Sequence, residues 1–320
     1  MTSLTDFVNP EQGSDSVHSF SRGNTAPWIA APFGMTHWAP QTEEGNRFYK
    51  STARQLQGVR ATHQPSPWIG DYGHFLVMPQ VGDMLTGNER QASVFRRADT
   101  VIKPYVFETF LGRYQTQLAV TATERCACFR FRFPQESARR ILLQPLVGAS
   151  WFQVSGNRLE GFTRGNSGGV PPGFACYIYA EVDADISGSS LFSGEQSFHG
   201  ESESEQVGVA LELAQGGEVS FRVATSFVSI DQARRNFDAE VKGRSFEALR
   251  DQSQAIWDER LGRIQIEGAT QIQRETFYSC LYRTQLFPRI WHEPDEGGQP
   301  IHYSPYDGEV HKGVLYADNG

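Results

Sequence analysis

The chain has 320 residues and a mass of 35.8 kDa, enough to bury a substantial core and to form two domains. Its 37 acidic and 29 basic residues give a formal net charge of −8, which argues against nucleic acid or an anionic membrane as the main partner. No run of 18 apolar residues occurs, so the sequence predicts no membrane span. Aromatic residues at 12% and 31 glycines favour β structure.

The N-terminal residues 1–6 contain neither a basic region nor the start of an apolar run. This start predicts a cytoplasmic protein, with export of a native form left open. The four cysteines are too few for a disulfide framework in a chain of this length.

Residues 95–230 read as a series of short strands. Residues 125–133 alternate strictly, which places Ala127, Phe129, Phe131 and Phe133 on one face and Cys126, Cys128, Arg130 and Arg132 on the other. Ser155-Gly156-Asn157 predicts a hairpin between residues 151–154 and 158–163. Further strands are expected at 177–182, 207–213 and 219–228. Because no helix separates them, the spacing predicts a large antiparallel β-sandwich within residues 1–228.

Helical periodicity replaces this pattern after residue 228. Ser229 with Gln232 predicts a capped helix over 230–241, and apolar spacing predicts a second helix from Phe246 to Leu261. A short strand is expected at 264–266. Thr270 with Gln273 predicts a third capped helix that ends near residue 285. We therefore expect linker helices over residues 229–268 and the first helix of an all-α region within 269–320.

The first 80 residues hold five clusters dense in Pro and Gly, which predicts ordered loops rather than strands there. The clusters are residues 8–10, 21–25, 31–35, 38–42 and 63–73. Their side chains are of the types that bind sugars. Trp68 offers an apolar face to the C–H side of a sugar ring, while His63 and Asp71 can exchange hydrogen bonds with its hydroxyls. Arg22 and Asn24 are weaker candidates for substrate contact on a neighbouring loop. Alternatively, these loops only cap one end of the sandwich, with His and Trp buried locally.

Several of these motifs resemble the opening of glycoside hydrolase family 92, and they occur in the family's order. They are Val8-Asn9-Pro10, Gly23-Asn24-Thr25, Pro32-Phe33-Gly34-Met35, His63 through Gly73, the segments 226–236 and 257–264, and Phe277 through Arg283. The resemblance covers essentially the whole chain. It implies a β-sandwich followed by an (α/α)6 barrel, and an exo-acting α-mannosidase, in many members specific for α-1,2 linkages. It also implies calcium-dependent inversion at the anomeric carbon.

In the family, both catalytic carboxylates and most calcium ligands lie in the barrel. The catalytic residues are therefore expected beyond Gly320, no metal ligand is assigned here, and the 320 residues alone are expected to be inactive. Asp318 lies where the family's chain reaches a substrate-binding junction. The partners implied are mannose-containing oligosaccharides and the rest of the barrel. Two other readings stay open: a carbohydrate-binding sandwich without catalysis, and a purely structural module.

Trp68→Ala in the complete enzyme should lower kcat/KM. The corresponding activation free energy should rise by about 1–3 kcal/mol, the scale of lost aromatic burial. Steady-state kinetics on an α-1,2-linked mannobiose measure this loss. Unchanged kcat/KM would remove Trp68 from the site.

Overall fold

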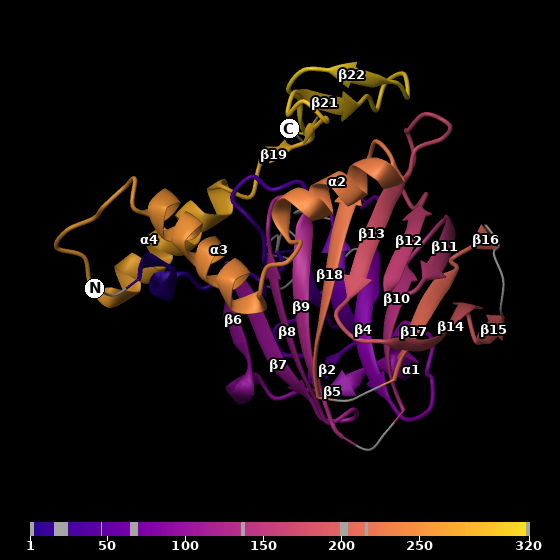
Figure 1. Cartoon of the computed structure of the whole chain (residues 1–320). Coiled ribbons are helices and arrows are strands. Elements are labelled where there is room, and N and C mark those ends of the chain that lie inside the picture. Colours follow the sequence, from indigo (N-terminus) through magenta and orange to yellow (C-terminus); the bar gives the residue numbers. More distant parts are fainter. Residues whose placement is uncertain are drawn as a thin grey trace.

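The computed structural model describes residues 3–15, 25–45, 47–64, 70–135, 138–198, 204–214 and 217–317. Two antiparallel sheets pack face to face as a sandwich, and helices lie against one outer face (Figure 1). The seven-stranded sheet has the order β1 (His37–Gln41), β3 (Gly58–Thr62), β4 (Phe75–Val81), β10 (Arg139–Pro145), β17 (Gly208–Leu213), β14 (Ile186–Ser193), β15 (Gln196–Phe198).

The nine-stranded sheet has the order β16 (Ser204–Glu205), β11 (Ala149–Ser155), β12 (Arg158–Thr163), β13 (Cys176–Val182), β18 (Gly217–Ser226), β9 (Cys126–Phe133), β8 (Thr116–Ala122), β7 (Val106–Leu111), β6 (Val101–Lys103). Smaller sheets pair β2 (Gln55–Leu56) with β5 (Ser93–Val94) and β19 (Arg289–Ile290) with β23 (Tyr316–Ala317), and join β20 (Glu293–Pro294), β21 (Pro300–Tyr303) and β22 (Val310–Lys312). The predicted sandwich is confirmed.

The sheet pattern predicted for residues 125–133 is present in β9, but its outer face is buried at Cys126 and Cys128 and open only toward Arg132. Phe129 and Phe131 point into the core between the sheets, where Phe129 lies edge-on to Trp38 at 5.3 Å between ring centroids. Cys126 and Cys128 are equally buried on the other face, because helices cover it. The hairpin around Gly156 is also confirmed: Ser155 and Arg158 are paired across it, and Gly156 has φ +60°.

The helices predicted after residue 228 are confirmed. They are α2 (Ile230–Glu240), α3 (Phe246–Leu261) and α4 (Gln271–Thr284); the shorter helices are α1 (Asn88–Gln91), η1 (Leu4–Phe7) and η4 (Arg97–Asp99). The Ser229 side chain caps α2, and Thr270 and Gln273 form the expected reciprocal capping box at α4. Helices α2 and α3 lie against the nine-stranded sheet, and α4 packs with the N-terminal segment, which includes Val8 and Trp28 (Figure 1). None of the described helices is long and apolar enough to cross a membrane.

Two local predictions are wrong. The sequence predicts a loop at residues 38–42, but residues 38–41 lie in β1; the sheet tolerates Pro40 there because β1 is its edge strand. Residues 264–266 belong to no strand, because no neighbouring strand pairs with them. The strands expected at 207–213 and 219–228 are present as β17 and β18, and these consecutive strands enter different sheets.

Phe129→Ala should lower the free energy of unfolding by about 3–5 kcal/mol, because it removes a fully buried ring and leaves a cavity. Urea denaturation followed by Trp fluorescence measures the loss. Phe110→Ala is the matched control, because Phe110 lies in the same sheet with 40% of its surface exposed. Equal losses in the two variants would contradict the assignment of the core.

Candidate functional site

Two of the five predicted substrate-binding residues lie in the described structure. His63 directly follows β3, and Asp71 lies between residue 70 and the start of β4. Trp68, Arg22 and Asn24 lie outside the described residues, as does Asp318, so their predicted roles stay predictions. The structure therefore shows the base of the predicted sugar-binding loop.

Asp71 joins both ends of this loop. Its Oδ2 accepts hydrogen bonds from Arg60 Nη2 at 2.8 Å and Nε at 3.2 Å. Its Oδ1 accepts from the backbone N–H of Tyr72 at 2.8 Å and of His63 at 3.2 Å. Burial opposes the charge, but neighbouring His74, Arg60 and His63 hold the pKa of Asp71 at about 2. Arg60 supplies the opposite charge at neutral pH, so Asp71 is a permanent acceptor and cannot act as a general acid.

His63 has a supporting position. Its side chain is fully buried, and Nδ1 donates to the carbonyl oxygen of Tyr72 at 2.8 Å. Nε2 lies 3.0 Å from the Thr36 hydroxyl, which donates to it when the ring is neutral. Burial lowers the pKa of His63 to about 3, against a smaller opposing effect of Asp71. Both ring nitrogens are engaged, which favours support of the loop over direct contact with a ligand.

A polar hollow of about 370 Å³ lies beside Asp71. We call it the Asp71 hollow; its lining includes Gln41, Glu44, Arg60, Asp71, His74, Asn88, Leu146, Val147, Asn166 and Ser167. Two buried lining atoms, His74 Nδ1 and Asn88 Oδ1, have no hydrogen-bond partner in the part of the chain that the structure describes. Burial lowers the pKa of His74 to about 4, so this imidazole is neutral at pH 7. The hollow therefore offers unused donors and acceptors, which is the chemistry of a site for hydroxylated ligands.

The loop base is also tied to the segment that follows α4. Arg289, fully buried on β19, donates to the Tyr72 hydroxyl and to the Met35 carbonyl oxygen, the latter at 3.2 Å. Its guanidinium lies over the Tyr72 ring, 5.6 Å from the centroid, and Trp291 packs edge-on against the same ring. Partners more than 200 residues away in the sequence thus hold the Tyr72 side chain in place.

Sequence analysis missed Arg60, Tyr72, His74 and Arg289. The alternation of β3 does indicate that Arg60 points away from the core side chains of Val59 and Ala61, but its partner Asp71 lies on another segment. Nothing in the sequence pairs Arg289 with Tyr72. Across the described ranges, no three His, Cys, Asp or Glu side chains converge in a way that could hold a metal ion.

The sequence matches the glycosyl hydrolase family 92 N-terminal domain over residues 7–226 and the family 92 catalytic domain over residues 232–320. The chain belongs to glycosyl hydrolase family 92. The part of the family 92 catalytic domain present here includes α3, α4 and the small sheets that hold Arg289.

Solved family 92 structures have the same fold as this chain. It is 36% identical to the inverting mannosidase BT2199 of Bacteroides thetaiotaomicron, with a TM-score of 0.95 over 99% of this chain and 44% of that chain. The α-mannosidase BT3965 of the same bacterium gives 24% identity and a TM-score of 0.85 over 98% and 45%.

A protein of the fungus Arthroderma benhamiae described as an uncharacterized secreted glycosidase is 22% identical over 85% of this chain and 41% of its own length. The family 92 chain described here thus spans less than half the length of each of these relatives.

His74→Gln should make stability less sensitive to acid. The unfolded chain protonates this histidine near pH 6.5, whereas the folded chain keeps it neutral down to about pH 4. The unfolded state therefore binds the extra proton, and stability falls as the pH drops from 6.5 to 4. Replacing His74 should reduce this slope by about 1.4 kcal/mol per pH unit in urea denaturation. An unchanged slope would contradict a buried neutral His74.

Proposed function

We propose that this chain is the N-terminal, substrate-shaping part of an exo-α-mannosidase that removes terminal α-linked mannose, with α-1,2 linkages as the preferred class. The observation that carries the proposal is the match of both family 92 domains in order along the chain. The 36% identity to an inverting mannosidase over 99% of this chain supports mannose as the sugar. Mannose-containing oligosaccharides are the proposed partners.

The Asp71 hollow supports a role in binding rather than in bond cleavage. An inverting glycosidase needs one protonated carboxyl and one carboxylate about 6.5–9.5 Å apart. Asp71 cannot supply the proton, because its pKa is about 2 and Arg60 neutralises it. We therefore propose that the catalytic pair belongs to the remaining length of the catalytic domain, and that the 320 residues alone are inactive.

Calcium is proposed only for the complete enzyme. The described residues do not fit a calcium site, because no three acidic or other ligating side chains converge. Calcium takes six to eight oxygen ligands in proteins. Ligands for calcium would have to come from the rest of the catalytic domain. The residues described above are assigned no role in binding it.

A carbohydrate-binding module without catalysis is the second candidate. It is favoured by the unpartnered His74 Nδ1 and Asn88 Oδ1 in a hollow whose buried carboxylate is held ionised. Such a module would bind mannosides with no release of free sugar.

Mannose release from α-1,2-linked mannobiose separates the two candidates. We expect no release by the 320 residues and calcium-dependent release, abolished by EDTA, by the polypeptide of the complete gene. Calcium-dependent release by the 320 residues alone would place the catalytic carboxylates within them. No release by either polypeptide would favour the binding module.

A further inference from the structure

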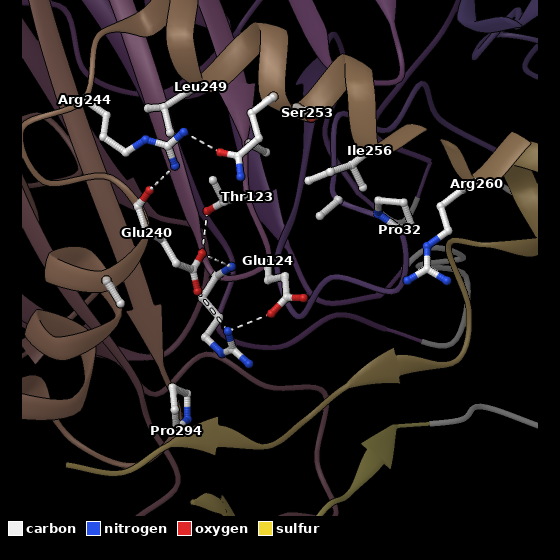
Figure 2. A pocket seen from close by; sticks show the side chains of 15 residues that line it. Pro32, Thr123, Glu124, Glu240, Arg244, Leu249, Ser253, Ile256, Arg260 and Pro294 are labelled. Carbon is white, nitrogen blue, oxygen red and sulfur yellow. Dashed lines mark hydrogen bonds and ion pairs between the residues drawn. The ribbon is translucent and has the colours of Figure 1, made fainter. Parts of the chain in front are cut away.

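A second hollow, of about 330 Å³, opens where α2, α3 and the turn between β8 and β9 meet (Figure 2). We call it the linker hollow. It shares no lining residue with the Asp71 hollow. Its apolar lining comes from different parts of the chain: Pro32, Leu249, Ile256 and Pro294.

The carboxylates of this hollow share one arginine. Arg125 Nη1 donates to Glu124 at 2.9 Å and to Glu240 at 2.8 Å. The other oxygen of Glu240 accepts from the Thr123 hydroxyl and from the Arg125 backbone N–H, so three hydrogen bonds already occupy this carboxylate. Glu124 has 52% of its side chain exposed and keeps acceptor capacity toward the hollow, where Figure 2 shows its carboxylate.

Two side-chain donors on α3, Arg260 and Ser253, make no hydrogen bond to another described residue. Within the described ranges, the Arg260 side chain makes no hydrogen bond or ion pair, and Figure 2 shows its guanidinium at the opposite side of the hollow from Glu240. Ser253 is only 5% exposed, and its hydroxyl has no partner among the described residues. A buried hydroxyl without a partner destabilises the folded chain, so a ligand that forms a hydrogen bond with it recovers that free energy.

The lining selects a neutral ligand with many hydroxyl groups. The charged lining has both signs: Glu124 and Glu240 against Arg125, Arg244 and Arg260, with Arg125 paired to both glutamates. A small ion of either sign would therefore have repulsive as well as attractive neighbours in the hollow. A sugar hydroxyl donates to a carboxylate and accepts from a guanidinium, so it pairs with both. The apolar side chains of Pro32, Leu249 and Ile256 can then contact the C–H groups of the ring.

We propose that the linker hollow is a second carbohydrate site, separate from the Asp71 hollow. It binds a single neutral hexose unit. The choice of mannose as that hexose rests on the proposed function, whereas the preference for a neutral polyol rests on the lining alone. A second site would hold another unit of a branched glycan and raise the effective concentration of its terminal residues at the catalytic site.

The experiment is a methyl-resolved NMR titration of the 320-residue chain with methyl α-mannoside, and separately with succinate as the anion probe. The δ-methyl groups of Leu249 and Ile256 report on the linker hollow, and the methyl groups of Leu146 and Val147 report on the Asp71 hollow. We expect shifts at Leu249 and Ile256 with a Kd of about 1 mM, the range of a small ligand with few contacts.

Arg260→Ala should weaken this binding about tenfold, the scale of a lost hydrogen bond to a charged group. Arg250→Ala is the matched control; Arg250 lies on the same helix, pairs with Asp251 and does not line the hollow. It should leave the Kd unchanged.

Four outcomes would overturn the proposal: no shift at Leu249 and Ile256 up to about 20 mM mannoside, a shift with succinate instead, a Kd insensitive to Arg260→Ala, or an equal loss in Arg250→Ala. Mannose release by the complete enzyme tests the proposed function independently. Release without shifts at Ile256 overturns the second site alone, and shifts without release leave the second site standing while the proposed function fails.

Discussion

The nine-stranded sheet is apolar on both faces at its centre, and much of the architecture follows from this constraint. Phe129 and Phe221 fill the core between the sheets, while Cys126 and Cys128 lie on the outer face and are as deeply buried. A sheet of this kind must be covered twice. The seven-stranded sheet covers one face, and α2 and α3 cover the other, with Phe237 and Leu249 against the cysteines. The linker helices are therefore part of the fold of the β region.

The match to the family 92 catalytic domain begins at residue 232, so this second layer of helices already belongs to it. Once α3 lies across the sheet, Trp257 of α3 and Tyr278 and Tyr282 of α4 pack on the N-terminal segment, and the chain returns over the end of the sandwich. Glu293 marks the return: its buried carboxylate accepts from Asn236 Nδ2 at 2.7 Å and from the Phe227 backbone N–H at 2.9 Å. The two hollows lie at the borders of these layers, where polar groups from separate segments meet without saturating each other.

Buried charge determines what the base of the predicted sugar loop can do. Arg60 holds Asp71 ionised, and the two neighbouring histidines stay neutral because burial disfavours their charged forms. A buried ion pair of this kind fixes geometry more reliably than it adds stability. Asp71 aligns the backbone of His63 and Tyr72, and Arg289 holds Tyr72 from the catalytic-domain side. The base of the loop, at His63 and Tyr72, is thereby joined to both domains of the family 92 chain.

The sequence by itself determined the class of fold, the hairpin at Gly156, the capped helices at Ser229 and Thr270, and the family, because these depend on residues close together in the chain. It did not show that β17 and β18 enter different sheets, or that Pro40 lies in an edge strand, because strand partners are distant in sequence. Only the tertiary structure decided that His63 supports the loop, that Arg60 neutralises Asp71, and that Arg289 reaches Tyr72. Each of these contacts depends on desolvation and on partners that come together only when the layers pack.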